Sequence, residues 1–193
     1  MQTDALRSIE HSIAQKRDAA LVKSTLAGDS TSFAKLVGLY TRRIAAFGMR
    51  FFRNAADTDD FVQDVFIKAY RSLSTFRGEA AFSTWLMRIA YNLAVNAVTR
   101  AKELLPLVDE QILSAPGYTP EEQEIRRLTA RAITEAVREL PEKYGICMEL
   151  YFYCDCAYEE IAVITGYPVN TIKSHIFRAK KLLRDKLRGY YEN

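Results

Sequence analysis

Hydrophobic residues recur at a helical period along most of the chain, and the alternating runs typical of strands are weak throughout. The pattern predicts helices over 5–27, 33–52, 58–72, 83–102, 121–139 and 141–153, followed by two more between 158 and 188. Gly28 ends the first of these segments, and Asp29 or Ser30 offers an N-cap for the second. We therefore expect an all-α fold.

The clearest pattern covers 158–184, where a short amphipathic segment and a longer one are separated by Gly166 and Pro168. Ile161 and Ile164 supply the inward contacts of the short segment. The apolar residues of the longer segment share one arc at the 3.6-residue period: Val169, Ile172, Ile176, Ala179 and Leu183. Two such segments around a glycine turn predict a helix-turn-helix.

The longer segment is also the most basic part of the chain. Residues 169–188 contain seven lysines and arginines against one aspartate, a net charge of +6, whereas the whole chain carries +3. Asn170, Ser174 and Arg178 lie opposite the apolar arc. A recognition helix in the major groove of DNA needs this arrangement of an apolar back, short polar groups and cations. A solvated basic helix without a ligand is the alternative.

A break in the helical pattern separates two parts of the chain. Three of the five prolines and Gly117 fall within 103–120, a composition that disfavours helix. Thr119, Pro120 and Glu122 then match an N-cap, a first-turn proline and a capping box. We expect two small helical modules, 1–102 and 121–193, joined by a flexible linker at 103–120.

The last predicted helix of the first module carries two distinct faces. Its apolar stripe consists of Leu86, Ile89, Ala90, Leu93 and Ala97. Arg88, Asn92 and Asn96 recur every four residues on another face, although asparagine is a mediocre helix former. These polar side chains either form bridges within the fold or donate to a base or phosphate.

The loop before that helix gathers aromatic side chains around a glycine. Phe76, Arg77, Gly78 and Phe82 fall close together, beside Trp85. Such a set either folds onto the core or stacks on an unpaired base.

Composition narrows the classes of protein that this chain can belong to. With 49% hydrophobic and 26% charged residues it is typical of globular proteins, and no apolar run approaches the ~20 residues that span a bilayer. The N-terminus lacks the apolar core of a secretory signal, so we expect a cytoplasmic protein without membrane insertion. The segment 57–72 carries four aspartates and therefore suits a basic protein partner better than DNA.

Residues capable of catalysis or metal binding are few. Cys147, Cys154 and Cys156, taken with His175, match no standard zinc spacing, so we expect buried free thiols, with redox sensing as the alternative. The other histidine is His11, and we find no nucleophile–base set or phosphate loop. We therefore expect no enzymatic activity, no metal site and no cofactor.

Several motifs together resemble one family. The signature FRG-x-x-x-FSTWL-x-RIA-x-NLA at 76–94, the acidic segment 57–72, the run PEKYGICMELYFY at 141–153 and the helix-turn-helix resemble the bacterial sigma-70 family. The resemblance is to its extracytoplasmic-function (group 4) RNA polymerase sigma factors, and it covers nearly all of the chain after about the first 25 residues. It implies a region 2-like helical bundle, a linker and a region 4-like helix-turn-helix.

By this resemblance, the chain binds core RNA polymerase through the clamp and flap regions and directs initiation at specific promoters. It also implies an anti-sigma factor as a partner. The implied contacts of the 57–72 helix with polymerase are Asp60, Gln63, Asp64 and Phe66.

The resemblance also implies two sets of DNA contacts. The set expected to read the −10 element as an opened strand is Phe76, Arg77, Phe82, Ser83, Trp85, Arg88, Asn92 and Asn96. The set expected to read the −35 element as duplex is Asn170, Thr171, Lys173, Ser174, His175, Arg178 and Lys181.

The sequence departs from the family pattern in three places. Ala157 stands where a small polar N-cap is usual, Cys154-Asp155-Cys156 stands where Glu-Gly-Leu is common, and His175 stands where arginine is frequent. The alternative function is a stand-alone helix-turn-helix regulator with a sensing or dimerising N-terminal half. That alternative predicts tight binding to palindromic duplex DNA without polymerase, and it leaves the 57–72 helix and the aromatic loop without a role.

Overall fold

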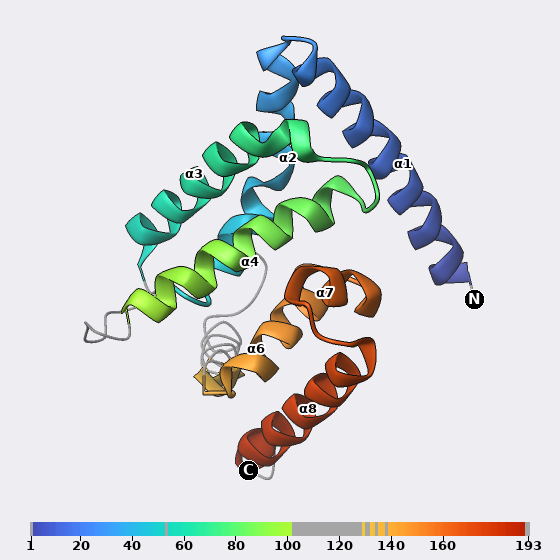
Figure 1. Cartoon of the computed structure of the whole chain (residues 1–193). Helices are drawn as coiled ribbons and strands as arrows, with labels where there is room; N and C mark the ends of the chain where they lie inside the picture. The colour runs from blue at the N-terminus through green and yellow to red at the C-terminus, as the bar shows by residue number, and fades with distance from the viewer. Residues whose placement is uncertain are drawn as a thin grey trace, which may run out of the picture. The chain divides into compact units, whose positions relative to one another are not determined.

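The computed structural model describes residues 2–52, 54–101, 129, 132–133, 135–137 and 139–191. All regular elements in these ranges are helical, which confirms the predicted all-α fold. None of the described helices is long and apolar enough to cross a membrane. The described residues form two compact units: one comprises 2–101 together with 163–165, and the other comprises the remaining described residues from 129 to 191 (Figure 1).

The first unit holds α1 (Gln2–Leu26), α2 (Ser30–Gly48), α3 (Ala55–Ser72), the short 3₁₀ turn η1 (Leu73–Thr75) and α4 (Phe82–Ala101). Helix α2 packs against α1, α3 and α4 and so lies at the centre of the unit (Figure 1). The side chains fully buried between these helices include Leu36, Ile44, Phe47, Val65 and Leu86.

Side-chain caps explain where α2 and α3 begin. The carboxylate of Asp29 accepts from the Thr31 N–H at 2.9 Å and from the Ser32 hydroxyl at 2.7 Å. These hydrogen bonds to the charged form lower the pKa of Asp29 well below its usual range. The Asn54 side chain accepts from the Asp57 N–H at 2.7 Å and caps α3. Gly28, at φ +102°, makes the turn between α1 and α2 that the sequence predicts.

A buried polar contact fastens α1 to α2. Asp18 is almost fully buried, and its carboxylate accepts from the Tyr40 hydroxyl and, at 2.8 Å, from the Arg17 guanidinium. Burial and the nearby carboxylate raise the pKa of Tyr40 far above its usual value, so Tyr40 remains a neutral donor. This contact fixes the wall that α1 contributes to the candidate site described below.

The second unit holds α6 (Glu142–Met148), the π-helical turn η2 (Glu149–Tyr153), α7 (Tyr158–Thr165) except its last three residues, and α8 (Val169–Tyr191). Helix α6 packs against α8. The sequence predicts one continuous helix over 141–153, but the backbone changes at Glu149 to the wider π turn, in which the Cys154 N–H donates to the Glu149 carbonyl at 3.0 Å. Leu150, Cys154, Ile161, Ile172 and Ala179 are buried in this unit.

Some predicted features lie partly or wholly outside the described residues. The linker at 103–120 and the capping signal of Thr119, Pro120 and Glu122 lie wholly outside them, so the predicted module boundaries are not described either. Within the predicted helix 121–139, the described positions 129, 132–133 and 135–137 are helical, and Ala132 and Ala136 are buried one turn apart.

Candidate nucleic-acid interface

A left-handed glycine joins the two helices of the helix-turn-helix. Gly166 adopts φ +77° and its N–H donates to the Ala162 carbonyl at 2.9 Å, which ends α7. The carbonyl of Pro168 then accepts from Thr171 and Ile172 at 2.9 and 3.1 Å and starts α8. Ile161, Ile164 and Ile172 are buried, as the apolar pattern predicts.

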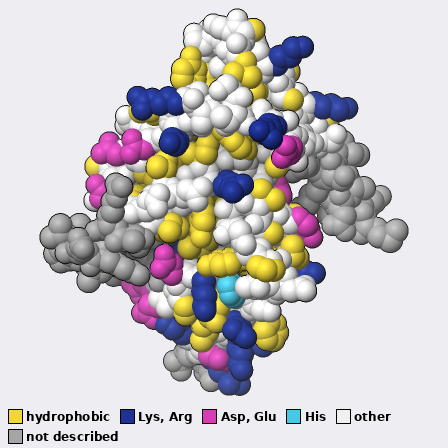
Figure 2. Space-filling model, in the orientation of Figure 1, with side chains coloured by type: hydrophobic (Ala, Val, Ile, Leu, Met, Phe, Trp, Pro, Cys, Tyr) yellow, Lys and Arg dark blue, Asp and Glu magenta, His cyan; other side chains and the backbone are white. Residues whose placement is uncertain are grey.

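The outward face of α8 carries most of the predicted −35 set. Asn170, Lys173, Ser174, Arg178 and Lys181 are exposed, and Thr171 is half-buried. The Ser174 hydroxyl donates to the Asn170 carbonyl at 2.9 Å. In the space-filling view, dark-blue Lys and Arg side chains gather over the part of the surface formed by α8 (Figure 2).

His175, which is also in the predicted −35 set, is not on that face. It is 7% exposed, and its Nδ1 lies 3.7 Å from the Cys147 Sγ. The rings of Tyr144 and Tyr167 lie 5.2 and 5.4 Å from the imidazole. Burial lowers the pKa of His175, with further lowering by the neighbouring cations, so the imidazole is neutral. Position 175 lies beside Ala179 on the inner arc of the helix, so its side chain points away from the exposed face of α8.

Phe177 is a surface residue of α8 that sequence reasoning missed. Its side chain is 71% exposed, and its direction on the helix lies between those of Lys173 and Lys181. The exposed ring lies within the polar face of α8, so a partner that binds this face would contact it. The signal was present in the sequence as the one aromatic residue opposite the apolar arc.

Aromatic rings support two of the cations on α8. The Lys173 ammonium lies 5.8 Å from the ring centre of Tyr158, which stacks on Tyr151 at 4.9 Å. The Lys180 ammonium lies 5.1 Å from the ring centre of Phe152. Cation–π contacts of this kind limit the freedom of long side chains while leaving their charge available to phosphates.

The loop before α4 is built around an aromatic cluster. Phe76 lies 5.8 Å from Phe82 and 5.5 Å from Trp85, measured between ring centres. Gly78 adopts φ +74°, which lets the chain turn back over these rings. Arg77 is exposed and makes only a loose ion pair, 4.0 Å, with Glu79.

Two residues of the predicted −10 set are buried in that cluster. Phe82 is 1% exposed and Ser83 is 8% exposed, so neither side chain presents a surface to DNA. The predicted direct contacts of both residues with DNA would need these side chains to become accessible. Phe76 and Trp85 remain half-buried, with part of their rings accessible.

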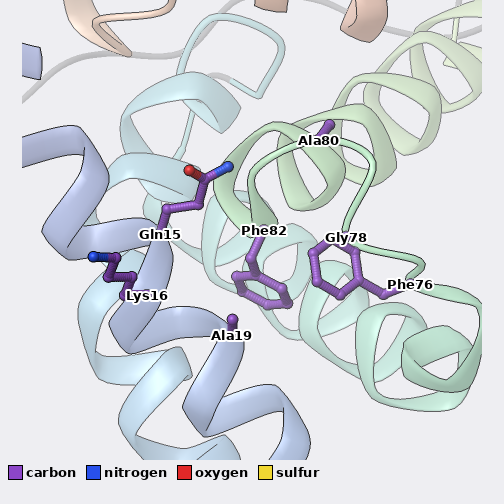
Figure 3. Close-up of a pocket in the computed structure, with 7 residues that line it drawn as sticks. All are labelled: Gln15, Lys16, Ala19, Phe76, Gly78, Ala80 and Phe82. Carbon is purple, nitrogen blue, oxygen red and sulfur yellow. The ribbon is translucent and has the colours of Figure 1, made fainter.

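A cavity of about 280 Å³ opens between this loop and α1. Its lining consists of Gln15, Lys16, Ala19, Phe76, Gly78, Ala80 and Phe82. Phenyl rings form one side, and the polar groups of Gln15 and Lys16 stand on the other (Figure 3). The part played by α1 was missed in the sequence because it depends on a contact between segments some 60 residues apart.

Helix α4 continues the surface beyond the loop. Arg88, Asn92 and Asn96 are all exposed, one turn apart. Of the predicted apolar stripe, Leu86 and Ala90 are fully buried. The other three, Ile89, Leu93 and Ala97, are half-buried. Met87 and Ala94 complete the buried stripe, which is therefore turned slightly from its predicted direction.

The acidic face of α3 is exposed at three of its four predicted positions. Asp60, Gln63 and Asp64 point to solvent, followed by the exposed apolar side chain of Ile67. Phe66 is 6% exposed and packs against Phe33 with 6.5 Å between ring centres. Phe66 therefore belongs to the core, and its predicted contact with polymerase would need this side chain to become accessible.

The three cysteines are free thiols and all are buried. Cys156 Sγ lies 3.6 Å from the Cys154 carbonyl oxygen. No group of three or more His, Cys, Asp or Glu side chains capable of holding a metal ion occurs in the part of the chain that the structure describes.

Comparison with known proteins agrees with this geometry. The family described as Sigma-70 region 2 matches residues 36–103, and the family described as Sigma-70, region 4 matches residues 130–183. The ECF RNA polymerase sigma-E factor of Haemophilus influenzae is 37% identical over 184 residues, which cover 90% of this chain and 96% of that protein. The RNA polymerase sigma-H factor of Pseudomonas aeruginosa is 33% identical over 181 residues, covering 89% and 94%.

Solved structures show the same fold at lower identity. CnrH, in complex with the cytosolic domain of CnrY, is similar with a TM-score of 0.68 at 21% identity, covering 90% of this chain and 98% of that one. The sigma factor RpoE of Bartonella quintana, in complex with the anti-sigma factor NepR, is similar with a TM-score of 0.63 at 22% identity, covering 81% and 96%. Identity over nearly the full length of curated relatives settles the family: the chain belongs to the extracytoplasmic-function RNA polymerase sigma factors of the sigma-70 family.

Proposed function

We propose that this chain is a promoter-specificity subunit, which binds core RNA polymerase and directs initiation by reading the −35 element as duplex and the −10 element as opened strand. The observation that carries the proposal is the combination, in one chain, of an exposed basic recognition helix, an aromatic-walled cavity and an exposed acidic helix face. Relatives named RNA polymerase sigma factors that match over nearly their whole length support it. Sigma factors are initiation factors rather than enzymes, so the phosphodiester chemistry belongs to the polymerase.

For the −35 element, α8 enters the major groove with its exposed face. Arg178 and Asn170 have the donors and acceptors that recognise base edges, and Lys173 and Lys181 suit phosphates. Phe177 offers an apolar contact of the kind made with the methyl group of thymine. His175 takes no direct part because it is buried.

For the −10 element, the cavity between α1 and the 76–82 loop receives a base that has left the duplex stack. Unpaired bases are recognised by stacking on aromatic rings, and Phe76 supplies an accessible ring at the rim. Asn92 and Asn96 on α4 and the cation of Arg77 are placed to contact neighbouring bases and phosphates. Loss of open-complex formation in the variant Asn92→Ala would support this role.

For polymerase binding, the exposed carboxylates of Asp60 and Asp64 suit a basic surface of the clamp. The second unit is expected to approach the flap. The modules proposed for these tasks are 1–102 and 121–193, with 103–120 as a tether. The proposal places the chain in the cytoplasm, together with the polymerase and the chromosome.

Regulation by an anti-sigma factor is part of the proposal. The RpoE structure is a complex with the anti-sigma factor NepR, and the fold of RpoE is similar to that of this chain. A partner that covers the faces used for polymerase and DNA would prevent initiation.

A stand-alone helix-turn-helix regulator is the other candidate. It accounts for α8 but gives no role to the acidic face of α3 or to the cavity at the 76–82 loop. Its distinguishing property is tight binding of the purified chain to palindromic duplex DNA without polymerase.

The test is reconstitution with purified core RNA polymerase, followed by run-off transcription from a pool of genomic promoters. A stoichiometric complex whose transcripts share one −35/−10 pair is the expected result. Arg178→Ala should then weaken initiation on those promoters while leaving the polymerase complex intact. No complex, combined with tight binding to duplex by the chain alone, would replace the proposal by the stand-alone regulator.

A further inference from the structure

Arg178, the cation proposed to read a base, is held by a residue of another helix. Its Nη1 donates to the hydroxyl oxygen of Tyr144 at 3.4 Å. Tyr144 belongs to α6, which packs against α8. The contact joins positions 34 residues apart, so it depends on the packing of the two helices.

The Tyr144 ring packs on His175, a side chain that is itself buried. The ring centre is 5.2 Å from His175, and Tyr167 lies 5.4 Å from the same imidazole. On its other side His175 contacts Cys147, which is fully buried. An imidazole at position 175 fits between the two tyrosines, and this arrangement leaves the Tyr144 hydroxyl at the surface beside α8.

A fixed hydroxyl matters to an arginine more than to most side chains. An exposed Arg side chain loses much of its rotamer entropy when it is ordered on a ligand. A hydrogen bond present before DNA arrives means that part of this entropy has already been lost. The guanidinium keeps its other N–H groups for a base, because only Nη1 donates to Tyr144.

The electrostatics of the contact agree with this arrangement. The hydrogen bond from Arg178 lowers the pKa of Tyr144, and the charges of Arg178 and Lys143 add to the effect. A phenol polarised in this way is a stronger donor. Since its oxygen accepts from Arg178, its own O–H can donate to a phosphate or base acceptor.

We infer that Tyr144 is a positioning residue for −35 recognition: its hydroxyl orients Arg178, so that α6 as well as α8 determines which base is preferred. The inference rests on the proposed function. It adds a determinant outside the recognition helix, in a segment whose sequence shows no DNA-binding signal.

The test uses holoenzyme assembled from core polymerase and the full chain, with Tyr144→Phe as the variant. Phenylalanine keeps the ring against His175 and removes only the hydroxyl. Binding is measured on a promoter and on its single-base variants across the −35 element. We expect affinity for the preferred sequence to fall about three- to tenfold and base preference to relax at one position, the one that Arg178→Ala also relaxes.

A double-mutant cycle separates positioning from general packing. If Tyr144 acts through Arg178, Tyr144→Phe should have little further effect in the Arg178→Ala background. Tyr153→Phe, which alters an exposed tyrosine of the same unit, is the matched control and should leave base preference unchanged. Equal losses at every −35 sequence, or additive effects in the cycle, would overturn the inference.

Failure of the proposed function has a different signature. If the unaltered chain forms no polymerase complex or selects no promoter, the proposed function fails and this inference fails with it. If the unaltered chain selects promoters and Tyr144→Phe selects them equally well, only the inference is wrong.

Discussion

At the scale of single residues, direction on a helix decides exposure more than residue type does. His175 and Phe177 are two positions apart on α8, yet the polar side chain is 7% exposed and the apolar one is 71% exposed. Two residues correspond to about 200° around a helix, which places them on opposite sides. The same effect buries Phe66 on α3 while Asp64 and Ile67 remain exposed.

Gly48 shows how one missing side chain determines a helix contact. A Cβ at this position would lie 2.7 Å from the Phe61 Cδ1. We expect Gly48→Ala to force α2 and α3 apart and to destabilise the first unit by about 1–3 kcal/mol. Trp85, the only tryptophan, lies in this unit, so its fluorescence during urea unfolding measures the change.

The control for this substitution lies on the same helix. Gly38 is exposed, and a Cβ added there would meet no atom within 4 Å. Gly38→Ala should therefore stabilise α2 by about 0.5–1 kcal/mol, because alanine loses less backbone entropy than glycine on folding. Equal effects of the two substitutions would show that close approach to Phe61 is not what requires glycine at position 48.

The buried imidazole predicts a pH dependence of stability. Burial lowers the pKa of His175 in the folded chain below the value of about 6.5 that it has when unfolded. Below pH about 6.5 the unfolded state therefore binds more protons, and stability falls as the pH decreases towards the folded pKa. Lys143 and Arg178 are the charged groups that lower the pKa of His175 further.

Thermal unfolding of the second unit, followed by the tyrosine signal between pH 7.5 and 5.5 (about one unit either side of the unfolded pKa), measures this effect. His175→Gln should flatten the profile because glutamine does not titrate. If both proteins lose stability in parallel as the pH falls, another group is responsible.

At the scale of elements, local signals in the sequence predicted most boundaries. Asp29 as a cap, Gly28 and Gly166 as left-handed turns, and the apolar arc of α8 act within one or two turns of chain, and the structure shows each of them. The π turn at Glu149 and the cavity wall formed by Gln15 were not predicted, because both depend on packing against distant segments. Burial of Ser83 was missed for the same reason, whereas folding of Phe82 onto the core was one of the two alternatives that the sequence predicted.

The N-terminus of α7 lacks a side-chain cap, and a substitution can supply one. Ala157 occupies the N-cap position with extended backbone and offers no side-chain acceptor, while Glu160 accepts from the Ala157 N–H at 3.0 Å. Only half of a capping box is therefore present. We expect Ala157→Ser to supply the missing acceptor and to stabilise the helix-turn-helix by about 1 kcal/mol.

Hydrogen exchange of the first amides of α7 is the direct measurement, since a new acceptor protects the N–H that it binds. Ala157→Val, which adds bulk without an acceptor, is the comparison. Similar protection in both variants would mean that the gain comes from packing rather than from the cap.

At the scale of the whole molecule, positive charge is concentrated in two separate parts of the chain. Residues 169–188 carry a net charge of +6, and residues 1–102 also carry +6, with 15 lysines and arginines against nine aspartates and glutamates. The intervening residues 103–168 carry −8, with five basic and 13 acidic side chains. Phosphate attraction can therefore come from both ends of the chain.

The proposed division of promoter reading between two tethered modules predicts a dependence on promoter geometry. Neither module should bind tightly alone, and joining them through polymerase can raise affinity by about 10²–10⁴-fold only if both sites are reached at once. Inserting about 5 base pairs between the −35 and −10 elements rotates one of them by half a turn of duplex. We therefore expect the amount of run-off transcript made by the holoenzyme to fall at least about tenfold on that template.

An insertion of a single base pair, which changes the angle little, is the control and should lower the amount of transcript less. Equal initiation on all three templates would mean that the −10 contacts alone select the promoter, and that the basic face of α8 serves only to attract DNA.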